Sequence, residues 1–431
     1  MLSAFANAFR TPDLRRKLLF VLFILVVFRF GSQLPAPGVH VANVDRCLNQ
    51  MESSGVYTLI NMFSGGALLQ LAVFALGIMP YITASIILQL LVVVIPRLEA
   101  LKKEGQAGQT KITQYTRYLT LALAVLQATG IVALARSGQL LQGCTEPLLH
   151  DDGTATFLVL VVTMTAGTAV IMWLGELITE RGIGNGMSLL IFTQVVATFP
   201  ASLWEVQLTQ GWWTFGIVMV IGLLIVAGVT FIEQAQRRIP VQYARRMVGR
   251  KMFGGSSTYI PLKVNQAGII PVIFASSLMY LPAMGVQFNQ TSNSRWIRYL
   301  NDYFVGGDHP IYMTAYFLLI IFFTYFYVSI TFNTNEVADN MKKYGGFIPG
   351  IRAGKPTEDY LSYVLSRITF PGALYLGLIA LIPLIAFAMI GANQNFPFGG
   401  TSILIMVGVG LDTVKQIESQ LQQRNYEGFL R

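Results

Sequence analysis

The sequence predicts an all-α polytopic membrane protein, with ten transmembrane helices in two inverted five-helix halves and one short re-entrant helix. Composition, apolar runs and the placement of positive charge support this prediction. Hydrophobic residues make up 54% of the 431-residue chain and charged residues only 12%, and the mean hydropathy is +0.56. Because soluble domains are about one quarter charged, this composition excludes a soluble enzyme.

Uncharged apolar runs give the ten spans, since about 20 residues cross a hydrocarbon core roughly 30 Å thick. Their centres lie near residues 24, 82, 124, 166, 195, 222, 277, 321, 379 and 405. The loop from Trp204 to Trp213 divides the chain into residues 1–208 and 209–431, with five spans in each part. An odd number per half places the halves in opposite orientations, which is typical of an inverted repeat with a functional path at the interface.

The positive charges predict the orientation. Most of the 30 Lys and Arg residues fall at the chain ends and in alternate loops. The opposite side has few: Arg46, Arg136, Arg295 and Arg298, with Arg29 near the end of the first span. Since cytoplasmic loops carry the excess of Lys and Arg, both termini are expected in the cytoplasm.

Two cytoplasmic loops, near residues 234–266 and 333–365, are too long to be plain connections. In the first, two stretches with β character, around Ile239–Ala244 and Tyr259–Val264, flank a basic, Gly-rich tip. This pattern predicts a protruding β-hairpin. The second loop contains the segment GGFIPGIRAGKPT.

The residues that usually carry chemistry are sparse and scattered. His40, His150 and His309 all fall in outer loops, without metal-ligand spacing. Cys47 and Cys144 also lie on the outer side, where they either form a single disulfide or remain two free thiols. We therefore expect no metal or cofactor.

Carboxylates are absent from the centres of the spans. Glu176, Glu180, Glu233 and Asp412 lie at span ends, whereas an ion-coupled transporter usually needs an intramembrane Asp or Glu. No nucleophile and base can be paired either. The sequence thus disfavours an intramembrane enzyme and a secondary transporter for a small solute, although the transporter remains the alternative because it shares inverted repeats and broken helices.

A segment ahead of the second span, NMFSGGALLQLAVFALG, is apolar but too short and too rich in Gly to cross a membrane. Such half-helices are tolerated only inside protein or against a cavity. We expect a re-entrant helix over Asn61–Leu71. Its residues are Asn61, Met62, Phe63, Ser64, Gly65, Gly66, Ala67, Leu68, Leu69, Gln70 and Leu71.

The second span carries one stripe at helical spacing, namely Ile78, Ile82, Ser85 and Gln89. Two further spans begin in a comparable way. The fifth has Met187 and Ile191, and the seventh has Asn265 followed by Ile273. On this pattern alone, ordinary core packing is the favoured explanation of these residues.

Five motifs extend over essentially the whole chain in the assigned order: ALGIMPYITASIILQLL, TERGIGNGMSLLIF, PLKVNQAGIIPVIFASSL, GGFIPGIRAGKPT and GGTSILIM. Together they closely resemble the SecY family, the pore subunits of the bacterial protein-conducting translocon. The resemblance implies a channel for unfolded secretory polypeptides, with a plug helix, an aliphatic ring, and a lateral exit for transmembrane segments between the second and seventh spans. The implied ring is Ile78, Ile82, Met187, Ile191, Ile273 and Ile405. Met187 departs from the usual Ile.

The resemblance also implies a lateral gate with polar residues Thr83, Gln89 and Asn265, in which the two amides face each other or are satisfied core amides instead. Cytoplasmic docking residues are expected at Arg352 and Lys355, with the hairpin cations Arg245, Arg246, Arg250 and Lys251. The implied partners are SecE-like and SecG-like small membrane subunits, a SecA-like motor ATPase, the ribosome, signal peptides, unfolded polypeptides and the lipid bilayer. The implied location is the bacterial plasma membrane.

Overall fold

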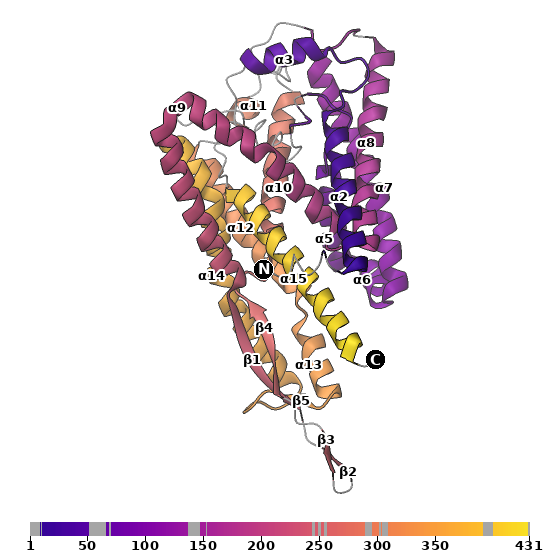
Figure 1. Cartoon of the computed structure of the whole chain (residues 1–431), viewed down its shortest axis with the longest axis vertical. Helices are drawn as coiled ribbons and strands as arrows, with labels where there is room; N and C mark the ends of the chain where they lie inside the picture. The colour runs from indigo at the N-terminus through magenta and orange to yellow at the C-terminus, as the bar shows by residue number, and fades with distance from the viewer. Residues whose placement is uncertain are drawn as a thin grey trace.

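The structure is a computed structural model of the whole chain. It describes residues 9, 11–50, 66–68, 70–136, 147–151, 153–243, 246–248, 251–253, 257–288, 295–300, 303, 309–390 and 400–429. Long helices dominate, and a small β-sheet projects from one end (Figure 1).

Each predicted span centre falls within a long helix. The long helices are α2 (Pro12–Gln33), α5 (Met79–Val94), α7 (Gln106–Arg136), α8 (Thr154–Arg181), α9 (Gly186–Gln234), α10 (Ile270–Phe288), α12 (Pro310–Thr331), α14 (Lys355–Ile390) and α15 (Gly400–Phe429). Short helices lie in the loops: α3 (Val41–Gln50), α6 (Pro96–Lys103), α11 (Arg295–Leu300) and α13 (Thr334–Lys343). The prediction of a mostly helical, multi-pass membrane protein is confirmed.

Helix α9 contains both the fifth and the sixth predicted span. Gly211 interrupts it with φ 81° and ψ 175°, a conformation that favours glycine. The two arms of α9 meet at this break at the upper left of Figure 1. The boundary predicted between residues 208 and 209 therefore lies next to a real break in the chain path.

Not every span is a full-length helix. Among the described residues, five helices are long and apolar enough to cross a membrane alone, and α5 with α6, bent by 98°, makes a sixth. Since irregular backbone at membrane depth must be buried in protein or line a cavity, the turns before α5 and its bend into α6 mark the region where a site is expected.

The two long loops on one side form a single sheet. Strand β1 (Gln236–Tyr243) pairs antiparallel with β4 (Ser257–Lys263), with Ile239 opposite Ile260, which confirms the predicted hairpin. Strand β5 (Gly346–Phe347) from the second loop pairs with the other edge of β1, and the sequence did not predict this pairing. Buried residues from both loops form the core beneath the sheet: Ile239, Val241, Leu262, Met341, Ile348, Leu361 and Val364.

The sheet and α13 lie at the opposite end of the molecule from α3 and α11 (Figure 1). The hairpin continues into β2 (Arg246–Val248) and β3 (Lys251–Phe253), which form its tip. This separation agrees with the assignment of alternate loops to opposite sides.

The described part of the predicted re-entrant helix is not helical. Gly66 to Leu71, apart from Leu69, forms turns that continue towards α5. Gly66 and Leu71 have φ values of 89° and 47°, outside the helical range. Ala36 N donates to Leu71 O at 3.0 Å, and Ala72 forms a β-bridge with Pro35. These contacts hold the segment in a series of turns, so the described residues 66–68 and 70–71 do not form the predicted helix, while residues 61–65 and 69 lie outside the described part.

The outer loops join near α3. Val39 forms a β-bridge with Leu149, and the rings of His40 and His150 stack with centroids 3.6 Å apart. Cys47 is buried and disulfide-bonded. Of the two alternatives left open by the sequence, the disulfide therefore holds for Cys47. Cys144, the other cysteine of the sequence, lies outside the described part.

Candidate functional site: an aliphatic constriction between α5, α9, α10 and α15

A cavity of about 420 Å³ lies where α5, α9, α10 and α15 converge, with α7 and α8 forming a side wall. Five of the six predicted ring residues line it: Ile82, Met187, Ile191, Ile273 and Ile405. The sixth, Ile78, is buried in the same apolar cluster as Ile191 and Ile405. The structure therefore brings together side chains from four helices that are far apart in the sequence.

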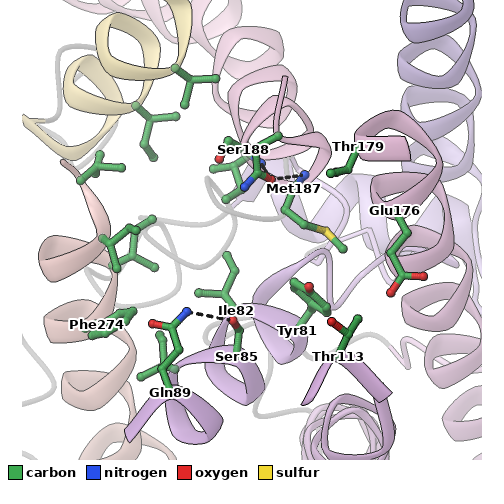
Figure 2. A pocket seen from close by; sticks show the side chains of 18 of the residues that line it. Tyr81, Ile82, Ser85, Gln89, Thr113, Glu176, Thr179, Met187, Ser188 and Phe274 are labelled. Atoms are coloured by element: carbon green, nitrogen blue, oxygen red, sulfur yellow. Dashed lines mark hydrogen bonds between the residues drawn. The ribbon is translucent and has the colours of Figure 1, made fainter. Parts of the chain in front are cut away.

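The ring side chains differ in burial. Ile78 and Ile405 are each 1% exposed, whereas Ile82 and Met187 are half-buried and extend into the cavity (Figure 2). Their contacts are mostly aliphatic, and Ile82 belongs to the clusters on both sides of the constriction. Such a surface offers a permeating ion no hydrogen bond or charge.

Met187 is positioned by the first turn of α9. The Asn185 side chain caps this helix by accepting hydrogen bonds from Met187 N at 3.0 Å and Ser188 N at 3.4 Å. The Met187 sulfur lies over Gly175 of α8, where a Cβ would overlap it. A Cβ at Gly186 would instead overlap the backbone oxygen of Gly175. The two glycines thus set how closely α8 and α9 approach.

These neighbouring glycines provide a matched pair of variants. Gly186→Ala should lower the thermal unfolding midpoint of the purified protein, since overpacking against backbone costs about 1–3 kcal/mol. Gly175→Ala should have a smaller effect, because the flexible Met187 side chain can move away. Equal losses of stability in the two variants would contradict this account of the α8–α9 contact.

An ion pair that the sequence did not predict forms the polar wall of the cavity. Arg117 of α7 donates from Nε and Nη2 to Glu176 of α8, both at 2.8 Å, and the Glu176 side chain is 19% exposed. Gln114 supports the guanidinium from one turn earlier, at 3.1 Å. The available signal was one basic and one acidic residue at the ends of two successive spans.

The polar gate residues have local partners. Gln89 Nε2 donates to Ser85 Oγ at 3.5 Å beside the cavity (Figure 2), and Thr83 Oγ1 donates to Met79 O. Asn265 is 3% exposed and donates to Glu233 Oε1 at 2.6 Å. In the described part of the chain, no hydrogen bond joins Gln89 to Asn265, so a direct amide pair is not part of this conformation.

The helices of the expected gate do meet at the cavity. The α5 face with Ile82 and Gln89 lines one wall and the α10 face with Ile273 and Phe274 another. α5 packs mainly on α7 and touches α10 only narrowly. A second cavity, of about 350 Å³, extends from Gln89 between α5, α6, α7 and α12.

The predicted docking residue Arg352 lies exposed on a short loop before α14. Gly350 and Gly354 have φ values of 82° and 106°, which favour glycine. Thr357 Oγ1 donates to Arg352 O at 2.8 Å. Preceding Arg352, Ile348 is buried in the core of the sheet, so the loop is anchored on both sides.

The other docking cations are placed less fully. Lys355 is exposed at the start of α14. Arg246 and Lys251 lie in β2 and β3 at the hairpin tip, and Arg245 and Arg250 lie outside the described residues. Within the described ranges, no group of three or more His, Cys, Asp or Glu could hold a metal ion.

The fold is that of a multi-pass membrane protein with a partly aliphatic cavity where α5, α9, α10 and α15 converge. A family model described as SecY matches residues 72–414. The chain is 68% identical, over all of both sequences, to "Protein translocase subunit SecY" of Streptomyces scabiei. It belongs to the SecY family.

Solved structures agree at the level of fold. A SecY channel described by its closed-state plug domain superposes with a TM-score of 0.60 at 19% identity, covering 93% of this chain and 91% of that one. Canine Sec61 in a ribosome-channel complex superposes with a TM-score of 0.59 at 19% sequence identity, with the same coverage of both chains. With the SecY family match and the 68% identical SecY relative, this fold identifies a protein-translocation channel, and the alternative of a small-solute transporter is set aside.

Proposed function

We propose that the six ring residues form the seal through which an unfolded polypeptide passes. The observation that carries this proposal is the convergence of Ile82, Met187, Ile191, Ile273 and Ile405 on one cavity. At rest an aliphatic constriction blocks ions by dewetting. During transport, the same side chains pack around the moving chain without sequence preference, and the thioether of Met187 adapts most readily.

The segment Asn61–Leu71 acts as the plug in this proposal. A solved SecY channel is described as having a plug domain that stabilises the closed state and maintains a membrane seal. In this chain, Leu68 and Leu71 are buried in a cluster with α7 and α8. A plug held in this way favours the closed state, and its release accompanies opening.

The gate opens between α5 and α10 and releases apolar segments into lipid. Its polar residues are Thr83, Gln89 and Asn265. The narrow contact between these helices supports this choice. A transmembrane segment leaves sideways because each Leu or Ile prefers the membrane centre by a few tenths of a kcal/mol.

The channel itself performs no catalytic step, and the energy comes from a cytoplasmic partner. We propose that it lies in the bacterial plasma membrane with both termini in the cytoplasm, beside SecE-like and SecG-like subunits. A SecA-like motor or a ribosome docks on the sheet side, through Arg352, Lys355 and the hairpin cations. The ribosome-bound canine Sec61 of the same fold supports such a surface.

A stalled secretory chain tests the proposal. Photocrosslinkers placed at Ile191 and Ile405 should react with the chain trapped in the assembled translocon. The matched control is Leu224 on α9, which is apolar and 68% exposed, and it should react with lipid or another subunit instead. Crosslinks from Leu224 but not from the ring would refute the assignment of the pore.

A further inference from the structure

The start of α10 is joined to the base of the cytoplasmic hairpin. Residues 264–269, between β4 and α10, form bends and turns, and Gly268 has a φ of 62°. Val264 N donates to Ala235 O at 3.0 Å, directly after α9. Gly372 of α14 approaches so closely that a Cβ would lie 2.5 Å from Val264 O. This connection is therefore packed between the end of α9 and the middle of α14.

One side chain within the connection is almost fully buried. Asn265 Nδ2 donates to Glu233 Oε1 at 2.6 Å and to Gly268 O at 3.2 Å. Its Oδ1 is buried without a hydrogen-bond partner, which costs free energy. Asn265 therefore depends strongly on Glu233, because a hydrogen bond to a charged acceptor is about twice as strong as a neutral one.

The position of this hydrogen bond connects the sheet with the ring. Glu233 lies three residues before β1, and Asn265 lies two residues after β4. The next turns of α10 place Ile273 against the cavity. Nearby, Lys263 of β4 forms a 3.3 Å ion pair with Asp412 of α15, the helix that carries Ile405. The hairpin base thus contacts two of the helices that form the ring.

We infer that Glu233 is a positioning residue for the gate: by holding Asn265 it fixes the start of α10 in the conformation in which Ile273 meets the ring. Movement of the sheet then reaches the constriction through this hydrogen bond. The inference rests on the proposed function of the ring and of the α5–α10 gate. Glu233 lies on α9, outside the predicted gate. The inference therefore adds Glu233 to the residues that set the equilibrium between the closed and the open gate.

The test compares Glu233→Leu, Glu233→Gln and Asn265→Leu in the assembled translocon. Both Leu variants should raise resting ion conductance in planar bilayers, and export of a reporter with a defective signal sequence, by roughly tenfold, since each removes a hydrogen bond to a charged group. Glu233→Gln keeps an acceptor and should retain most of the wild-type behaviour. The double Leu variant should be no worse than either single variant, because both remove the same interaction.

A charge exchange keeps the test valid if the Leu variants accumulate poorly. Asn265→Asp places two carboxylates together and should increase conductance, and adding Glu233→Gln should reverse the increase, since the new amide can donate to Asp. Glu99→Gln, which breaks only an exposed ion pair with Lys103 on α6, is the matched control and should change little.

Additive effects of the two Leu variants would overturn the inference, and so would a failure of Glu233→Gln to rescue Asn265→Asp. Unchanged conductance in all Glu233 and Asn265 variants would also overturn it, provided that a ring variant, Ile405→Asn, still opens the channel. If Ile405→Asn has no effect either, the proposed function of the ring fails as well, so the two failures can be told apart.

Discussion

Replacing Ile405 by asparagine is expected to make the resting channel conduct ions. Ile405 is 1% exposed and lies at the constriction with Ile191. An amide at this position binds water in the open state. In the closed state it is buried without a hydrogen-bond partner. That burial costs about 1–3 kcal/mol, which corresponds to roughly a 5- to 150-fold shift towards the open state. Single-channel recordings in planar bilayers measure this shift.

The matched control for this variant is Ile405→Leu, which keeps an aliphatic side chain of the same size. It should leave the resting conductance near the wild-type level, since volume-conserving apolar exchanges cost little. Equal conductance of the Asn and Leu variants, at equal amounts of assembled complex, would mean that Ile405 is ordinary core and does not seal the pore.

Exchanging Arg352 for glutamate is expected to abolish motor-driven translocation without affecting membrane insertion. Arg352 is exposed on a loop fixed by Gly350, Gly354 and Thr357, so its guanidinium can bind a carboxylate or phosphate in a bidentate manner. Insertion should remain normal because many other cytoplasmic cations orient the chain. ATP-dependent import into inverted vesicles measures the loss, and Arg352→Lys should be intermediate because Lys lacks the planar fork.

Lys343→Glu provides the charge-matched control. Lys343 is exposed at the end of α13, which β5 and then the Arg352 loop follow along the chain, and its exchange changes the net charge by the same amount. If both glutamate variants lose translocation equally, a general electrostatic surface is responsible instead of Arg352. Normal translocation by Arg352→Glu would leave Arg352 with a topological role only.

Hydropathy was sufficient to predict the helices, because each span needs an apolar run whatever its neighbours are. The hairpin was predictable for a similar reason, since β1 and β4 are separated by a short Gly-rich tip. The motifs predicted the ring residues, and in the structure five of the six line one cavity. In each of these cases, local sequence carries the relevant physical constraint.

Contacts between distant segments were not predictable in this way. The pairing of β5 with β1 involves only two residues of the second loop. Two residues are too few to show the alternation of apolar and polar side chains by which a strand is recognised. The path near Leu71 depends on backbone bonds to Leu34 and Ala36, which override the apolar, helix-like composition. The sequence predicted that Asn265 faces Gln89 at the lateral gate. In the structure its partner is Glu233, and these two residues come close only when the hairpin between them folds.

The three-stranded sheet also imposes an order on biosynthesis. Strand β1 pairs with β4 as soon as both have left the ribosome, but its other edge waits for residues 346–347. During this interval the α10 and α12 segments must enter the membrane while an unpaired strand edge stays exposed outside it, and such an edge readily pairs with other chains. Completion of the sheet therefore depends on insertion of the eighth span, and nascent chains that end before β5 are the ones most exposed to wrong pairing or early proteolysis.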